Sequence, residues 1–112
     1  MGVITMEKIK VLGLLSLFLS MNVCAKEVHI DIYKFAFTPS QITVKQGDTV
    51  IWTNKEKRQY HSVWFKQLFK KEPDYLFPDE VYQYTFNKLG SFPYECGPHP
   101  RMKGVIKVVV NK

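Results

Sequence analysis

Four side chains of the 112-residue sequence combine a thiol, two imidazoles and a thioether, a set suited to binding a transition metal. Cys96, His99 and Met102 have the spacing Cys-x2-His-x2-Met, and His61 supplies the second imidazole from upstream. Imidazole suits several metals, whereas thiolate and thioether together select copper. Two histidines and a cysteine around a metal, with a weak axial methionine, are typical of mononuclear copper sites for electron transfer. The sequence therefore predicts one copper ion bound by these four residues.

Each of these side chains, taken alone, has an ordinary structural explanation. A single histidine such as His61 or His29 usually lies at the surface or in a hydrogen bond, and a single methionine usually fills a core. Zinc is a second candidate because Cys96, His61 and His99 suit it, although a thioether is a poor zinc ligand. The complete set, on a chain that we expect to be exported, favours copper.

The beginning of the chain has the organisation of a secretory signal peptide. Basic residues precede an apolar run over residues 11–19, and Val23 and Ala25 occupy the two positions that a signal peptidase recognises. The run is much shorter than the roughly 20 residues of a membrane span, so an uncleaved anchor is the minor alternative. The residues before Cys24 are also a poor context for lipid attachment. We therefore expect cleavage before Lys26.

Cleavage at this point divides the chain into a signal peptide, residues 1–25, and a mature copper-binding domain, residues 26–112. It removes Cys24 and leaves Cys96 as the only thiol, so no intramolecular disulfide can form. The formal net charge of +6 for the whole chain falls only to about +5, which favours an acidic partner. Export to the periplasm separates the protein from nucleic acid, and we expect no nucleic-acid partner and no stable membrane insertion.

The sequence of the mature part predicts an all-β domain. Alternating or extended runs predict short strands over residues 28–33, 41–44, 49–54, 61–65, 81–86, 91–96 and 105–110. No window has a helical period, and residues 66–80 fit either a short helical turn or an irregular hairpin. Several short strands with turns between them suggest a two-sheet sandwich. We expect its core to contain the aromatic residues Phe35, Phe37, Trp52, Phe86, Phe92 and Tyr94.

The segment 94–104 resembles the copper loop of the cupredoxins, the blue copper proteins. Its sequence is Tyr-Glu-Cys-Gly-Pro-His-Pro-Arg-Met-Lys-Gly. Four other segments, residues 37–39, 44–50, 52–54 and 81–86, are also similar to this family, so the resemblance covers nearly the whole mature chain. It implies a Greek-key β-sandwich of about seven to eight strands, with copper near one end. It also implies that the ligands are His61, Cys96, His99 and Met102.

Two positions beside His61 depart from the usual pattern of the family. Ser62 replaces an asparagine whose side chain braces the loop that carries the cysteine. Tyr60 replaces a proline or a smaller residue and places a phenol close to the site. Both leave the ligand set intact, but groups around the ligands tune the reduction potential and the rigidity of a metal site.

The predicted function is single-electron transfer in the periplasm by a soluble, monomeric carrier that is not an enzyme. By the resemblance, the exposed edge of His99 is the electron port, and Pro98 and Pro100 surround it with a small apolar patch. Basic residues would steer an acidic partner in transient encounters, unless they form only a solvated surface. They are Lys55, Lys57, Arg58, Lys66, Lys70, Lys71, Arg101 and Lys103. The partners expected are a c-type cytochrome, a dehydrogenase or an oxidase.

Two other functions use similar chemistry. A periplasmic copper-binding protein for copper trafficking or tolerance would need the same four ligands, so the sequence separates it poorly from an electron carrier. An enzyme such as a nitrite reductase or a multicopper oxidase needs additional copper sites. The 3 histidines of this chain do not supply them.

Overall fold

The computed structural model describes residues 25–111, and this part of the chain contains seven β-strands and no helix. The strands are β1 Glu27–Tyr33, β2 Ala36–Thr38, β3 Gln41–Lys45, β4 Thr49–Asn54, β5 Val81–Thr85, β6 Gly90–Glu95 and β7 Lys103–Val109. The all-β prediction is confirmed. Apart from Ala25, the predicted signal peptide lies outside the described residues. Within residues 25–111, no helix is long and apolar enough to cross a membrane.

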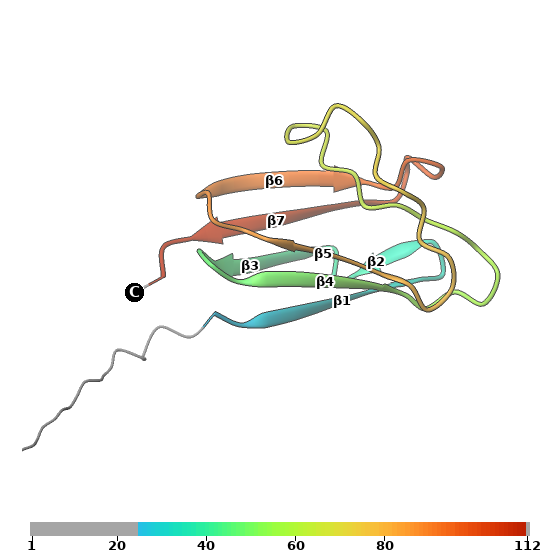
Figure 1. Cartoon of the computed structure of the whole chain (residues 1–112), viewed down its shortest axis with the longest axis horizontal. Helices are drawn as coiled ribbons and strands as arrows, with labels where there is room; N and C mark the ends of the chain where they lie inside the picture. Colours follow the sequence, from blue (N-terminus) through green and yellow to red (C-terminus); the bar gives the residue numbers. More distant parts are fainter. Residues whose placement is uncertain (1–24, 112) are drawn as a thin grey trace, which may run out of the picture.

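The strands form two sheets that pack against each other as a sandwich (Figure 1). One sheet has the order β2-β1-β4-β5 and the other has the order β3-β7-β6. Each sheet contains one parallel pair, β1 with β4 and β3 with β7, and the remaining pairs are antiparallel. Since parallel neighbours cannot be joined by a hairpin, the chain passes between the two sheets. The predicted two-sheet sandwich is thereby confirmed.

The core lies between the sheets because alternate side chains of each strand point inward. Trp52 of β4 is completely buried, and its ring contacts the rings of Phe65, Tyr82 and Tyr94 at centroid distances of 5.8, 5.7 and 5.4 Å. The buried cluster also takes aliphatic residues from both sheets, namely Ile30, Ile32, Val44, Val50, Ile106 and Val108. This aromatic centre holds the two sheets at a fixed separation without a disulfide.

The prediction of Phe35 as a core residue is wrong, whereas the other five predicted core aromatics are buried. Phe35 is 48% exposed. Lys34 and Phe35 have positive φ angles of 52° and 57° in the turn between β1 and β2. This turn interrupts the alternation of the strand, so Phe35 leaves the core face and lies against the rings of His61 and His99.

Two connections meet at the end of the sandwich opposite the C-terminus (Figure 1). Residues 55–80 join β4 to β5, and residues 96–102 join β6 to β7. The strand predicted over residues 61–65 is absent, because His61 bridges to Leu76 and Trp64 bridges to Glu95. Two bridges to different partners do not make a continuous ladder.

The segment 66–80, for which the sequence left two alternatives, contains elements of both. The amides of Leu68 and Phe69 donate to the carbonyl of Phe65 at 2.9 and 3.0 Å, which makes a single helical turn. The chain then returns to pair Leu76 with His61. The long connection is thus tied to the rest of the molecule at the residues around the predicted ligand.

Candidate metal centre

Residues 96–102 form a closed loop that carries three of the four predicted ligands. The amide of Cys96 donates to the carbonyl of Met102 at 3.0 Å, and the amide of Met102 donates to the carbonyl of His99 at 2.9 Å. A proline stands on each side of His99. Because proline fixes its own φ angle and restricts the preceding residue, the loop has few conformations open to it.

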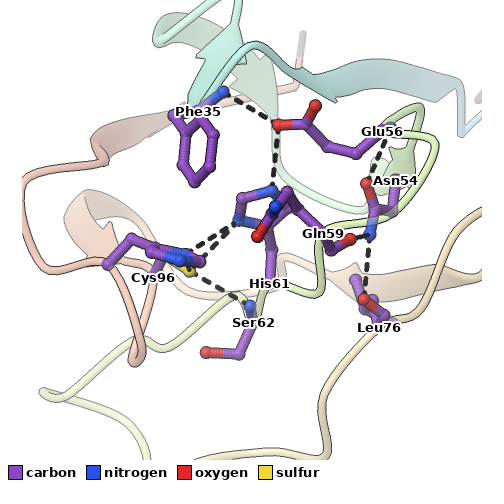
Figure 2. Close-up of polar contacts among 9 residues, drawn as sticks. Phe35, Asn54, Glu56, Gln59, His61, Ser62, Leu76 and Cys96 are labelled. Atoms are coloured by element: carbon purple, nitrogen blue, oxygen red, sulfur yellow. Dashed lines mark hydrogen bonds and ion pairs between the residues drawn. The ribbon is translucent and has the colours of Figure 1, made fainter.

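His61 reaches the same place from the long connection and is completely buried. Its backbone exchanges two hydrogen bonds with Leu76, at 3.1 and 2.7 Å. The buried side chain of Asn54 donates to the carbonyls of Gln59 and Leu76, both at 2.9 Å, and accepts from the amide of Glu56 at 2.9 Å (Figure 2). These bonds fix the position of the His61 backbone relative to the end of β4.

The ligand atoms of three predicted residues form a nearly equilateral triangle. The Sγ atom of Cys96 lies 3.6 Å from Nδ1 of His61 and 3.5 Å from Nδ1 of His99, and the two nitrogens are 3.2 Å apart. The point in their plane that is equidistant from the three atoms lies about 2.0 Å from each, close to the distances of about 2.0–2.1 Å and about 2.3 Å at which imidazole nitrogen and thiolate sulfur bind zinc. The donor set and its spacing therefore fit a metal ion held by two histidines and one cysteine.

Met102, the fourth predicted ligand, is buried at the end of the loop that carries Cys96 and His99, and it is only 5% exposed. Together with Phe35, His99, Pro100 and Arg101 it lines a surface cavity of about 390 Å³. A thioether that approaches a copper site from outside the plane is a weak ligand that tunes the metal. Met102 lies on the same closed loop as Cys96 and His99, and its role as the fourth ligand stays a prediction.

The carboxylate of Glu56 faces the side of the His61 ring opposite Cys96 (Figure 2). Its Oε2 atom lies 3.1 Å from Nε2 of His61 and accepts from the amide of Phe35 at 2.9 Å. This contact favours a proton on Nε2 and leaves Nδ1 free for the metal. Burial lowers the pKa of His61 although Glu56 opposes this shift, so the neutral ligand form is favoured.

The pKa of Glu56 itself lies below its usual value. Burial opposes its ionisation, but the amide of Phe35 and the imidazole of His61 outweigh this effect. Nothing in the sequence indicated this residue, because it stands in a polar, lysine-rich loop that is typical of solvated surface. Its contact with His61 arises only when the loop folds back on the turn after β1.

The sulfur of Cys96 is completely buried and accepts from the amide of Ser62 at 3.3 Å (Figure 2). Burial raises the pKa of the Cys96 thiol, although the hydrogen bond from Ser62 acts in the opposite direction. A bound cation reverses this preference because it holds the thiolate form. The site is therefore one in which thiolate formation depends on the metal.

Exposed aromatic residues surround the partly exposed His99. Phe35 meets the His99 ring edge-on at 5.0 Å, and Tyr60 lies 6.3 Å from it between ring centroids. Tyr60 also stacks on Tyr75 at 4.8 Å and contacts Phe77 at 5.9 Å. We call these four side chains, Phe35, Tyr60, Tyr75 and Phe77, the aromatic surface. The expected closeness of Tyr60 to the site is confirmed.

Two of the eight predicted steering residues already have an acidic partner. Lys66 and Lys103 lie 3.1 and 3.3 Å from the two carboxylate oxygens of Glu95, and Lys66 also lies over the ring of Trp64. The other six are exposed, and Arg101 belongs to the loop that carries His99. His29 is exposed on β1 and is not part of the ligand cluster, as the sequence indicated.

A family model, related sequences and solved structures all relate this chain to copper-binding proteins. Residues 24–111 match the family described as copper binding proteins, plastocyanin/azurin family. The chain is 38% identical to amicyanin of Paracoccus versutus over 93 residues, which cover 80% of this chain and 68% of the relative. The crystal structure of that amicyanin resembles it with a TM-score of 0.69 at 35% identity, over 79% of this chain and 86% of the other. The copper(I) form of an amicyanin variant gives a TM-score of 0.70 at 32% identity, over 79% and 87%.

Proposed function

Because the chain belongs to the plastocyanin/azurin family of copper-binding proteins, we propose that it carries single electrons at a centre formed by His61, Cys96, His99 and Met102. Its cofactor is one copper ion, and the predicted likeness to the cupredoxins is confirmed. When bound, copper supplies a one-electron change between Cu(II) and Cu(I). The triangle of one sulfur and two nitrogens is the observation that carries the proposal.

The residues around the ligands hold them in one geometry. Glu56 fixes the orientation of the His61 ring, the Ser62 amide points at the Cys96 sulfur, and the closed loop restrains His99. Ligands that are fixed by surrounding hydrogen bonds rearrange little when the charge of the site changes. A small rearrangement is what rapid electron transfer requires.

The port for electrons in this proposal is the edge of His99. His61 and Cys96 have no exposed surface, whereas His99 is partly exposed beside the aromatic surface. Exposed apolar area of this kind suits brief contact with another protein. Exposed cations such as Arg101 and Lys57 would favour an acidic docking face on a c-type cytochrome, a dehydrogenase or an oxidase.

The proposal includes export to the periplasm, cleavage before Lys26, a monomeric state and no enzymatic activity of the chain itself. The basic segment, apolar run and small residues of positions 1–25 support export. The small size of the domain and its single candidate metal cluster among the described residues support a carrier that reacts with separate enzymes.

Copper trafficking is the alternative, and the burial of the ligands argues against it. Transfer of copper by ligand exchange requires the ligands of an acceptor to reach the ion. Two of the three clustered side chains, His61 and Cys96, are completely buried. A carrier should therefore undergo repeated oxidation and reduction while it loses copper slowly to a chelator. Rapid transfer to a chelator or to an apo-acceptor would favour trafficking.

The visible spectrum of the copper-loaded protein tests the proposed centre. A thiolate bound to Cu(II) should give an intense charge-transfer band, which disappears in Cys96→Ser and on reduction. His29→Ala is the matched control, because His29 is an exposed histidine outside the cluster. A band that persists in Cys96→Ser, or that is lost equally in His29→Ala, would exclude this ligand set.

A further inference from the structure

A carboxylate from the long connection takes part in the hydrogen bonding of the copper loop. The hydroxyl of Ser62 donates to Oε2 of Glu72 at 2.8 Å, and the amide of Gly97 donates to Oγ of Ser62 at 2.8 Å. Ser62 is completely buried, and Glu72 is partly buried. The three residues join the segment after His61, the long connection and the residue that follows Cys96.

The hydrogen-bonding capacity of a hydroxyl shows why the carboxylate matters. A serine hydroxyl has one proton and two lone pairs. Because Glu72 accepts the proton of Ser62, the lone pairs are available to the amide of Gly97. Without an acceptor at position 72, the buried hydroxyl loses the partner that orients it. Burying an unpaired donor is unfavourable, so the Ser62 side chain is expected to reorient.

The glycine beside Cys96 provides the space that Glu72 occupies. A Cβ atom added at Gly97 would collide with the carboxylate of Glu72. The φ angle of Gly97 is not in the left-handed region, so the backbone conformation permits a side chain there, but the Glu72 carboxylate would have to move to admit it. The position of the Glu72 carboxylate in this structure therefore requires a residue without a Cβ atom at position 97.

We propose that Glu72 is a positioning residue for the copper centre, acting through Ser62 and Gly97 on Cys96. The same Ser62 whose hydroxyl meets Glu72 donates its amide to the Cys96 sulfur. The carboxylate thus orients the hydroxyl that accepts from Gly97, on the same residue whose amide contacts Cys96. Its negative charge also favours the more positive, oxidised site and lowers the reduction potential. The proposal rests on the ligand set of the proposed function.

Three variants separate the positioning effect from the effect of charge. Glu72→Gln keeps an oxygen that accepts from Ser62 but removes the charge, so it should raise the reduction potential and leave the spectrum nearly unchanged. Glu72→Ala removes both and should also shift the charge-transfer band. Asp74→Asn is the control, because exposed Asp74 lies on the same connection and carries the same charge.

A second measurement needs no copper. In the metal-free protein, hydrogen exchange of the Gly97 amide should be several-fold faster in Glu72→Ala than in Asp74→Asn, because the acceptor Ser62 Oγ loses its orientation. Gly97→Ala should destabilise the metal-free protein, and Glu72→Ala should relieve most of that loss in the double variant. This coupling follows from the shared space and not from a general effect on folding.

The outcomes separate this proposal from the proposed function. If Gly97 exchange is unchanged in Glu72→Ala and the two substitutions are additive, the positioning role is wrong, whatever the copper chemistry. An equal potential shift in Glu72→Gln and Asp74→Asn would exclude a specific effect of the Glu72 charge. Coupling in the metal-free protein together with a missing charge-transfer band in the native protein would instead refute the proposed copper centre.

Discussion

The Oε2 atom of Glu56 lies 3.1 Å from Nε2 of His61, on the side of the ring that faces away from Cys96 (Figure 2). The imidazole is therefore held between a carboxylate on its Nε2 side and the other two corners of the ligand triangle, Cys96 and His99, on its Nδ1 side. A carboxylate behind a ligating histidine sets its tautomer and strengthens it as a ligand. Glu56, a loop residue that nothing in the sequence singles out, therefore influences how His61 binds the metal.

Replacing Glu56 should weaken copper binding. Substitutions of partners of this kind typically reduce metal affinity by about 10- to 100-fold, and we expect Glu56→Ala to lie in this range. Glu56→Gln should have a smaller effect because its amide oxygen still accepts from Nε2. Competition with a chelator of known affinity measures the change. Glu27→Gln, an exposed substitution on β1, is the control, and equal losses in both variants would contradict the prediction.

The turn before β2 should control access to the histidine ligands. Phe35 lies edge-on to the rings of His61 and His99, at 5.5 and 5.0 Å. Phe35→Ala should expose these rings. It should accelerate both the loss of copper to a chelator and the oxidation of the reduced copper site by small reagents. Tyr33→Ala is a close control, because Tyr33 is 47% exposed and Phe35 is 48% exposed beside the same turn. The expectation fails if both variants show the same rates by stopped-flow absorbance.

Residue types and spacing predicted the cluster of His61, Cys96 and His99 that the structure brings together, whereas the groups around it depend on contacts distant in sequence. Cys96, His99 and Met102 lie on one short loop, so their convergence is a local property. Glu56 and Glu72 are polar residues of a loop, and only the folding of residues 55–80 gives them their partners. Phe35, a predicted core residue, lies outside the core because its positive φ angle is not encoded by an alternating sequence pattern.

Six of the seven strands were predictable for a similar reason, whereas the three-residue β2, directly before Pro39, was not predicted. Alternation along β1 and β5, and β-branched residues in β4 and β7, reflect the two faces of each strand. The residues near His61 have the same composition but no continuous partner strand, since His61 and Trp64 bridge to different segments. Pairing of this kind is decided by tertiary contacts, which composition does not reveal.

Asp48 should make stability depend on acid pH. It is almost fully buried, and its carboxylate accepts from the backbone nitrogens of Lys26 and Lys45 at 3.0 and 2.8 Å. Burial opposes its ionisation, but these hydrogen bonds and the nearby positive charges outweigh it, so the pKa lies below its ordinary value of 3.8. The folded protein therefore binds this proton more weakly than the unfolded chain does.

The stabilisation by Asp48 is complete above its ordinary pKa and is lost as the pH falls through the lowered value in the folded state. Urea unfolding of the metal-free protein at neutral and acid pH measures it. Asp48→Asn should lower stability at neutral pH and reduce the loss on acidification. Asp31→Asn, on the exposed face of β1, should leave the pH profile unchanged. Identical profiles for Asp48→Asn and the native protein would refute the assignment.

Processing before Lys26 should strengthen the same contact. Cleavage converts the Lys26 nitrogen, 3.0 Å from Asp48, from an amide into an ammonium group. A mature chain that begins at Lys26 should therefore unfold at a higher urea concentration than one with Ala25 retained. Mass spectrometry of the secreted protein identifies the terminus. In the Asp48→Asn background the difference between the two chains should vanish, and a difference that persists would show that the ion pair is not its cause.

Cations near His99 that have no acidic partner among residues 25–111 should contribute more to partner steering than the cations that have one. The carboxylate of Glu95 lies close to Lys103 and offsets its positive charge, whereas exposed Arg101 belongs to the ligand loop and lines the same cavity as His99. Arg101→Gln should lower the rate of electron transfer to an acidic cytochrome and flatten its dependence on ionic strength. Lys103→Gln, which removes the same charge, should have a smaller effect on both. Stopped-flow rates over a salt series measure the two slopes, and a steeper loss in Lys103→Gln would place the docking face over β6 and β7 instead of around His99.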